Sequence, residues 1–212
     1  MVRLSRAAAA IGAKRPSRAL ADLDYVDARL GDERTVAMLK WPHATAEHVA
    51  RAYRLITSGL RASANRELAR FDSEAQAIDA RRAILEERLR ETERPELERE
   101  EMLALAQLAL NASQRHDTRA AGDWLGRALA RADQLRARAN GVSDKEQLDV
   151  LRLAAELTVS MRATLVADLP RRLAAASAEL SSRREPSLLS YERWFEIYAP
   201  LVSSPSAVPQ AR

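Results

Sequence analysis

LRASANRELARFDSEAQAIDARRAILEERLRETER, residues 60–94, is the stretch that decides the fold. Apolar side chains recur in it at steps of three and four, the spacing that places them on one face of an α-helix. The members of this stripe are Leu60, Ala64, Leu68, Phe71, Ala75, Ile78, Leu85 and Leu89. Only Arg82 interrupts it. We therefore expect one long helix here, packed in a coiled coil or a helical bundle.

Helix-forming residues continue on both sides of this stretch, and Pro and Gly residues divide them into further helices. The breaks fall at Gly31, Pro42, Gly59, Pro95, Gly141, Pro170, Pro186 and Pro200. No stretch combines strict apolar–polar alternation with β-branched enrichment, so we predict no strands. The additional predicted helices cover 17–30, 33–40, 46–57, 96–115, 118–139, 144–168, 170–182 and 187–199. The expected fold class is all-α, with a small N-terminal helical region followed by long antiparallel helices.

Local signals mark several of these helix ends. Thr45 is expected to cap the helix that starts at 46, and Gly59 to end it in a left-handed conformation. Ser143 to Glu146 match a capping box, in which each end residue bonds the other's backbone. Gly122 and Gly126 weaken a helix, so we expect a close packing contact to require them.

Composition suggests the domain organisation. Apolar residues make up 47% of the 212-residue chain but aromatic residues only 4%, so each buried side chain contributes little area. For that reason we expect the long helices to form a homo-oligomer. The predicted segments are a basic flexible arm at 1–16, a helix-turn-helix-like region at 17–59, a bundle at 60–182, a short aromatic helix at 187–199 and a disordered tail at 200–212.

The chemistry of common active sites is missing from this sequence. Without cysteine there is no disulfide, no thiolate metal site and no cysteine nucleophile. The histidines lack metal-ligand spacing, and no phosphate-binding loop or serine elbow is present. The glutamates between 91 and 101 are mixed with arginines, as on a solvated corner between helices. We expect no catalytic residues, no metal, no cofactor and no membrane span, and hence a protein that is not an enzyme.

One stretch, residues 33–57, suggests a function. A short helix, a four-residue turn and a second amphipathic helix with cationic residues form a helix-turn-helix layout, whose second helix enters the major groove of DNA. The arm at 1–18 adds five cations and no acid. The predicted DNA-binding residues are Arg3, Arg6, Lys14, Arg15, Arg18, Lys40, His48, Arg51 and Arg54. Ordinary packing of two helices in a bundle is the alternative interpretation.

Further motifs add a resemblance to this layout. Three segments carry it: RELARFD at residues 66–72, and residues 117–124 and 139–142. With the helix-turn-helix layout, they resemble small DNA-binding proteins of bacteria and phages, including small terminase subunits of tailed phages. The resemblance covers residues 33–142. It implies a ring- or dimer-forming, non-enzymatic subunit that recognises DNA and passes it to a motor ATPase.

The helix at 187–199 concentrates aromatic side chains. Tyr191, Trp194, Phe195 and Tyr198 lie on one face, at i, i+3, i+4 and i+7. This face either docks on the protein's own core or inserts into the groove of a protein partner.

The sequence thus leads to two expectations of function. The first is a DNA-binding accessory protein, such as a DNA-packaging subunit, with double-stranded DNA as its partner. The second is a helical scaffold, adaptor or chaperone that acts through protein–protein contacts alone. The expected location is the cytoplasm of a bacterium or a phage-infected cell, and the Arg-, Ala- and Ser-rich N-terminus leaves an organellar transit peptide as the alternative.

Overall fold

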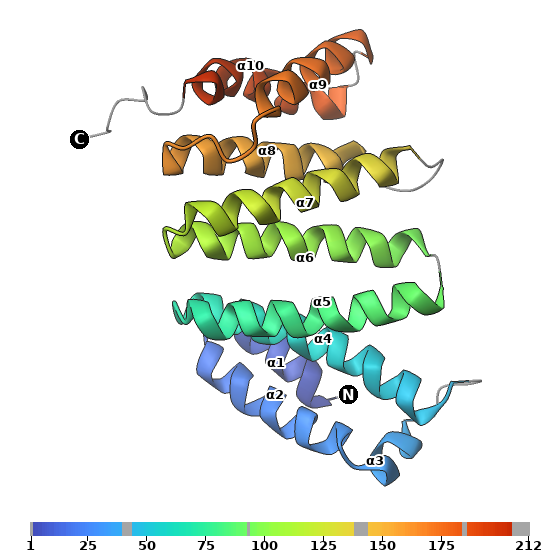
Figure 1. Ribbon diagram of the computed structural model, residues 1–212. Coiled ribbons are helices and arrows are strands. Elements are labelled where there is room, and N and C mark those ends of the chain that lie inside the picture. The colour runs from blue at the N-terminus through green and yellow to red at the C-terminus, as the bar shows by residue number, and fades with distance from the viewer. Residues whose placement is uncertain (1, 40–43, 93, 138–143, 184–185, 205–212) are drawn as a thin grey trace. The chain divides into compact units, whose positions relative to one another are not determined.

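The fold is all-α, as predicted (Figure 1). The computed structural model describes residues 2–39, 44–92, 94–137, 144–183 and 186–204, and within these ranges it contains no strand. The helices are α1 (Val2–Gly12), α2 (Pro16–Leu30), α3 (Glu33–Met38), α4 (Ala46–Glu67), α5 (Phe71–Glu91), α6 (Pro95–Gln114), α7 (Thr118–Arg136), α8 (Asp144–Met161), α9 (Leu169–Arg183), the 3-10 turn η1 (Pro186–Leu188) and α10 (Leu189–Ser203).

The chain divides into two compact units, Met1–Thr92 and Glu93–Arg212. Each unit has its own cluster of buried apolar side chains. The boundary therefore falls just before Pro95, whereas the sequence suggested a boundary at 59/60. That earlier boundary is wrong because α4 runs through Gly59 and pairs with α5 inside the first unit.

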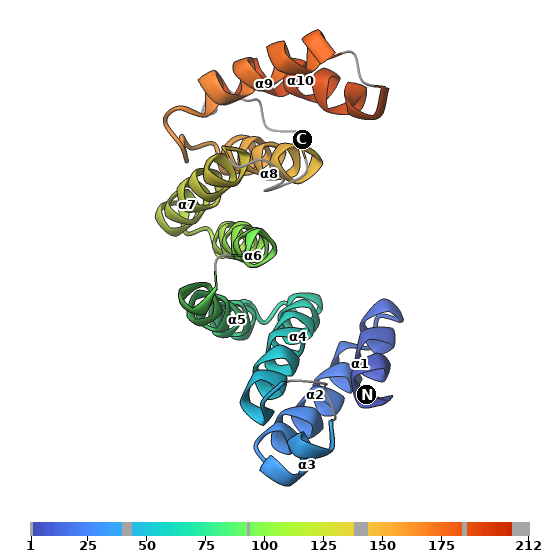
Figure 2. The ribbon, with the colours of Figure 1, turned by 90° about the vertical axis from the view of Figure 1, so that its right-hand side faces the viewer.

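The first unit is built around α4. Helices α1 and α2 form one antiparallel hairpin and α4 and α5 form another, and α4 also contacts α2, α1 and α3 (Figure 2). Leu23, Val49 and Tyr53 are buried in the core of this unit. Thr45 caps α4 as predicted, since its hydroxyl accepts a hydrogen bond from the backbone N–H of His48 at 3.2 Å.

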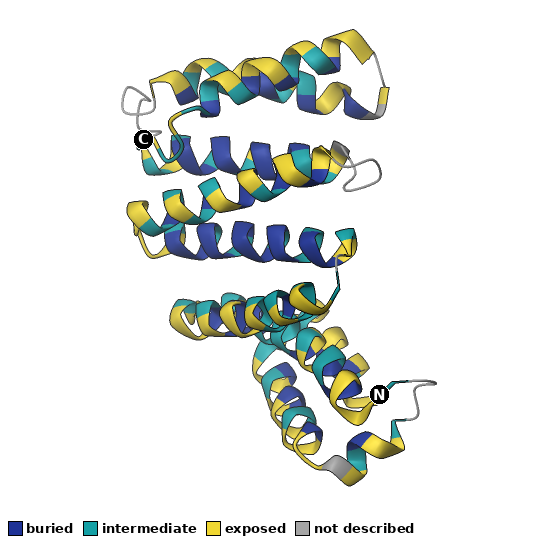
Figure 3. Ribbon diagram, turned by 45° about the vertical axis from the view of Figure 1, so that its right-hand side comes forward, coloured by how far each residue is buried: buried dark blue, intermediate teal, exposed yellow. Residues whose placement is uncertain are grey.

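The second unit consists of two helical hairpins on either side of one helix. Helices α6 and α7 pair with each other, α9 and α10 pair with each other, and α8 packs against members of both pairs. Helices α6 and α8 carry buried residues along much of their length (Figure 3). Large side chains such as Met102, Leu125 and Phe195 are fully buried there.

The stretch 60–94 is two helices rather than the single helix predicted. Helix α4 ends at Glu67, and Ala69 adopts the left-handed conformation with φ 53°. The backbone N–H of Arg70 then donates to the carbonyl of Asn65 at 2.9 Å, which satisfies an end carbonyl of α4. Phe71 starts α5, so the apolar stripe passes through a turn and the two halves pack side by side.

The N-terminal segment is also different from its prediction as a flexible arm. Residues 2–12 form α1, which buries Leu4, Ala7 and Ala10 against the rest of the first unit. Apolar residues at steps of three give this helix a face that packs, and its two arginines, Arg3 and Arg6, reach from the edge of that face to the buried Asp22 of α2.

Smaller differences concern other helix ends. Helix α8 stops at Met161 instead of 168, and Pro200 lies inside α10, so residues 200–203 are helical and not part of a tail. Gly59 is inside α4 and does not cap it. The turn at Lys40 and Pro42, the Ser143 end of the capping box and the tail from 205 onward lie outside the described residues. None of the described helices is both long and apolar enough to cross a membrane.

Candidate functional site: a polar groove in the first unit

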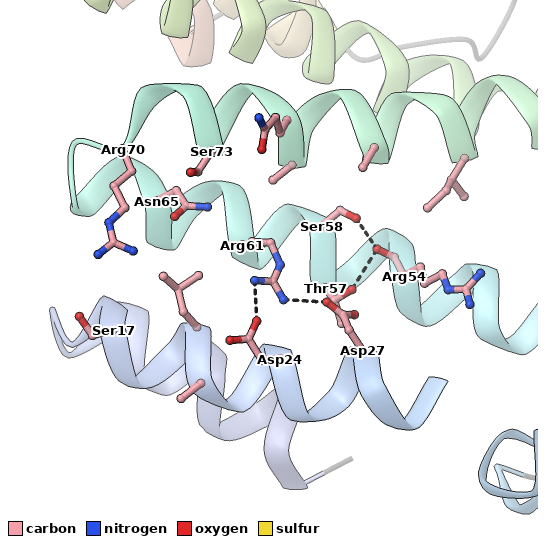
Figure 4. Close-up of a pocket in the computed structure, with 16 residues that line it drawn as sticks. Ser17, Asp24, Asp27, Arg54, Thr57, Ser58, Arg61, Asn65, Arg70 and Ser73 are labelled. Atoms are coloured by element: carbon pink, nitrogen blue, oxygen red, sulfur yellow. Dashed lines mark hydrogen bonds and ion pairs between the residues drawn. The ribbon is translucent and has the colours of Figure 1, made fainter. Parts of the chain in front are cut away.

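The first unit contains a groove of about 760 Å³ between α2, α4 and α5 (Figure 4). Helix α4 forms its floor, because α2 and α5 pack on either side of that helix. The lining residues are Ser17, Leu20, Ala21, Asp24, Asp27, Arg54, Thr57, Ser58, Arg61, Asn65, Arg70, Ser73, Gln76, Ala77, Ala80 and Ile84. The volume lies within the range of about 300–1,000 Å³ that is usual for ligand sites in proteins.

An ion-pair cluster crosses the middle of the groove. The Arg61 guanidinium donates to Asp24 at 2.8 Å and to Asp27 at 2.7 Å, which ties α4 to α2. Burial alone lowers the pKa of Arg61, but the hydrogen bonds to Asp27 and Asp24 outweigh it and hold this pKa above its ordinary value. Arg61 is consequently a fixed structural cation, and its two carboxylate partners leave this cluster with a net charge of −1.

The floor of the groove carries an asparagine amide. Asn65 lines the groove and is 5% exposed as a whole residue, and its amide atoms are not among the buried side-chain atoms that lack a partner in the described part of the chain. A second floor residue, Thr57, is buried too, and its hydroxyl donates to the Arg54 carbonyl at 3.2 Å. An asparagine amide carries both a donor and an acceptor, so Asn65 gives the floor of the groove one of each.

Two arginines lie at opposite ends of the groove, Arg54 toward one end and Arg70 toward the other (Figure 4). Both are exposed, and neither forms an ion pair among the described residues. With the net −1 of the Arg61 cluster, these two guanidiniums bring the charge of the lining to +1, and the positive charge lies at the two ends of the groove. Between them, Leu20, Ala77 and Ile84 supply an apolar lining.

Three of the cations predicted to contact DNA are engaged within the protein. Arg3 and Arg6 of α1 both donate to the buried carboxylate of Asp22, Arg3 at 2.8 Å and Arg6 through Nε at 2.6 Å. Lys14 donates to Glu67 at 2.7 Å. These bonds fasten α1 to α2 and to the end of α4.

Arg51 is held even more firmly, by three glutamates. It contacts Glu91 at 2.6 Å and Glu87 at 3.3 Å, both on α5, and also Glu47 on its own helix. Hydrogen bonds to Glu91 and then to Glu47 raise the pKa of Arg51 above its ordinary value. The side of α4 that carries Arg51 thus faces the acidic residues of α5.

The other predicted DNA-binding residues are more accessible. Arg15, Arg18, His48 and Arg54 are exposed and have no ion pair among the residues that the structure describes, whereas Lys40 lies outside these residues. Residues 1–92 hold 17 Lys and Arg against 13 Asp and Glu, so the whole excess of +4 belongs to the first unit.

The aromatic face of α10 is mainly internal. Phe195 is fully buried, and the buried Tyr191 donates its hydroxyl hydrogen to Asp149 of α8 at 2.6 Å. Burial, assisted by Asp149, raises the pKa of Tyr191 to about 12. Trp194 and Tyr198 are partly buried and stack with ring centroids 3.9 Å apart. This face therefore packs on the protein's own core, and only the Trp194–Tyr198 edge reaches the surface.

Sequence reasoning missed Arg61, Asn65 and Arg70, which are central to the groove. Their positions on a predicted polar helix face gave no signal, because the groove needs α2 and α5 beside that face. No group of three or more His, Asp or Glu residues suited to a metal ion is found in the described ranges. Oligomerisation and cellular location stay predictions.

Comparison with protein-family models, with curated proteins and with solved structures found no match to this chain.

Proposed function

We propose that this protein is a helical adaptor that binds a short acidic segment of a partner protein in the groove of its first unit. The observation that carries the proposal is the groove itself, with the Asn65 amide on its floor and an arginine at each end. This is the second of the two functions expected from the sequence, and it requires no catalytic step.

The dimensions favour an extended peptide. The lining residues of α5 run from Ser73 to Ile84, which are eleven helical steps apart, or about 16 Å. About five residues of extended chain cover that length at ~3.3 Å each. A partner segment of this size leaves its flanking residues near Arg54 and Arg70.

The groove's chemistry indicates what the segment contains. An asparagine amide can donate to a backbone carbonyl and accept from a backbone N–H at once, so Asn65 suits a peptide main chain. Guanidinium groups bind carboxylates with two parallel hydrogen bonds, so Arg54 and Arg70 favour Asp or Glu at both ends of the segment. Small apolar side chains fit between them, over Ala77 and Ala80.

Three labelled peptides of equal length test this proposal. They share an apolar five-residue centre and carry Glu, Gln or Lys at both ends, and binding is followed by fluorescence anisotropy. The Glu-ended peptide is expected to bind about tenfold more tightly than the Gln-ended one, and the Lys-ended peptide most weakly. Equal affinity for all three would contradict the proposal.

Variants assign the effect to the groove. Arg54→Gln with Arg70→Gln should remove the preference for Glu ends, whereas Arg34→Gln with Arg90→Gln removes the same charge from exposed positions outside the groove and should leave it intact. Asn65→Ala should weaken all three peptides alike, because it removes the amide that bonds the peptide main chain, while the free energy of unfolding changes little. A large loss of stability would instead assign Asn65 a structural role.

DNA binding is the second candidate function. The concentration of the whole charge excess in residues 1–92 favours it, together with the exposed Arg15 and Arg18. In this case those two arginines contact phosphates, while Arg51 contributes little because three glutamates surround it.

A mobility-shift titration with a duplex of about 25 base pairs separates the two candidates. Phosphate binding must weaken steeply as salt rises, and Arg15→Gln with Arg18→Gln should reduce the slope of log affinity against log salt by roughly 2. Absence of a complex at low salt would eliminate this candidate and leave the adaptor proposal untouched.

A further inference from the structure

A second, smaller pocket lies in the first unit, away from the groove. It has a volume of about 260 Å³ and is formed by α1, α2, α3 and α4. Its lining consists of Arg3, Leu4, Tyr25, Val26, Arg29, Leu30, Thr35, Leu39 and Tyr53. None of these residues lines the groove, so the pocket can be tested independently of the adaptor proposal.

The floor of the pocket is apolar. Leu4, Leu30 and Tyr53 are buried, and Val26 and Leu39 are partly buried around them. An apolar concavity of this kind favours a ligand part without polar groups, since buried polar atoms would lack hydrogen-bond partners there. The ligand's apolar part therefore points toward Leu30 and Tyr53.

The rim of the pocket is cationic. Tyr25, which is 46% exposed, has the Arg3 guanidinium 4.7 Å and the Arg29 guanidinium 5.5 Å from its ring centre. Arg3 is also bonded to Asp22, a carboxylate that it shares with Arg6, so Arg3 already has an ion-pair partner. Arg29 forms no ion pair within the part of the chain that the structure describes. One guanidinium beside an aromatic ring thus remains available at the mouth of an apolar pocket.

We propose that this pocket binds a small organic carboxylate with a short apolar chain. The carboxylate pairs with Arg29 at the rim, and the chain lies on Leu4, Leu30 and Tyr53. At water's share of about 30 Å³ for each non-hydrogen atom, the volume accommodates roughly eight or nine such atoms. This size excludes nucleotides and long acyl chains. Arg29 is a single guanidinium without an ion-pair partner among the described residues, and one such charge suits a monoanion better than a phosphate.

Hexanoate is the probe, and binding is measured on the full chain from ¹⁵N chemical-shift changes during titration. Hexanol has the same chain without the charge, and acetate has the charge without the chain. The proposal expects saturable shifts around Tyr25 and Leu39 with hexanoate, and affinity at least about tenfold weaker for hexanol and for acetate. Hexanol binding as well as hexanoate would overturn it, as would the absence of saturable shifts with any carboxylate.

The same chemistry can come from a free acid or from the carboxylate at the end of a protein chain. N-acetylalanine represents the chain end, because it joins a carboxylate to an amide and a small apolar side chain within about nine non-hydrogen atoms. Tighter binding of hexanoate assigns the pocket to free acids, and tighter binding of N-acetylalanine assigns it to chain ends. Either result supports the proposed chemistry, and failure of both overturns it.

Matched variants of α2 locate the charge. Arg29→Gln should weaken hexanoate binding about tenfold, and Arg29→Lys should retain part of it. Arg18→Gln, an exposed arginine of the same helix outside the pocket, should have no effect. Val26→Phe fills the pocket and should abolish shifts at Leu39, while circular dichroism verifies that each variant is folded. Unchanged hexanoate binding by a folded Arg29→Gln protein would overturn the assignment.

Discussion

Asp22 joins the first two helices through a carboxylate that two arginines share. Arg3 and Arg6 stand 19 and 16 residues before it, and both donate to its oxygens although the Asp22 side chain is only 2% exposed. The hydrogen bonds from Arg6 and then from Arg3 hold the pKa of Asp22 far below its ordinary value of 3.8. Folding consequently favours the ionised carboxylate.

This lowered pKa predicts a specific acid sensitivity. The stabilisation from Asp22 is fully present above the unfolded-state pKa of 3.8 and is lost as the pH falls toward the lower folded-state pKa. Urea unfolding midpoints measured between about pH 6 and 2 should therefore decline in acid. Asp22→Asn should lower stability at neutral pH and make the decline below pH 3.8 shallower. An unchanged acid slope in that variant would refute the pairing.

Gly122 and Gly126 provide a second test at the residue scale. Both lie on α7, but a Cβ added at Gly122 would be 2.8 Å from the carbonyl oxygen of Leu165, whereas one at Gly126 would meet nothing within 4 Å. The contact with Leu165 is the close packing expected from the sequence, although its partner is the chain between α8 and α9.

Alanine should have opposite effects at these two positions. Gly126→Ala should stabilise the protein by up to about 1 kcal/mol through helix propensity. Gly122→Ala should destabilise it by about 1–3 kcal/mol, because the backbone at Leu165 has to move. Thermal and urea denaturation measure both. Stabilisation by Gly122→Ala equal to that by Gly126→Ala would contradict the contact.

At the scale of the element, four helices in the described ranges end in a left-handed residue that is not glycine. These residues are Lys14, Ala69, His116 and Arg162, with φ between 53° and 58°. In each case the next N–H donates to a carbonyl five residues earlier, as Ala163 does to Thr158. Glycine is the usual residue there, so the ends at 69 and 162 could not be predicted from sequence. Ends marked by Gly31, Pro95 and Asp117 were placed correctly.

Glycine at position 69 should improve the turn between α4 and α5. Ala69 is exposed, and its left-handed conformation costs an L-residue about 1 kcal/mol that glycine avoids. We expect Ala69→Gly to stabilise the protein by about 0.5–1 kcal/mol. Ala83→Gly, an exposed position inside α5, is the control and should destabilise it by about 1 kcal/mol. Destabilisation by both changes, measured in urea, would argue for a continuous helix at 60–94.

The same scale explains how far the candidate sites could be predicted. Amphipathic spacing correctly grouped Tyr191 and Phe195 on one face of α10, because that pattern is local. The accessibility of a cation depends on residues far away in the sequence. Arg51, for example, is bonded to Glu91 of another helix, 40 residues later in the chain. The local sequence therefore predicted that Arg51 belongs to a basic, DNA-binding surface, whereas in the fold Arg51 forms ion pairs with glutamates.

At the scale of the whole molecule, the groove depends on three helices separated along the chain. Its lining runs from Ser17 to Ile84, and all of it belongs to the unit Met1–Thr92. Only the packing of α2 and α5 against α4 brings these residues together. The all-α class followed from periodicity, but the groove required knowledge of which helices are neighbours.

The first unit is expected to fold and to bind peptide without the second. It has its own buried cluster, in which Ala19, Leu23 and Ala64 are fully buried, and compact units with separate cores generally fold alone. A fragment of residues 1–92 should give a helical circular dichroism spectrum and a cooperative melt. It should also bind the Glu-ended peptide within about twofold of the full chain, since every lining residue is present. A fragment that folds but does not bind the peptide would show that the groove needs residues beyond 92. A fragment that does not fold would show that the core of the first unit depends on the second unit.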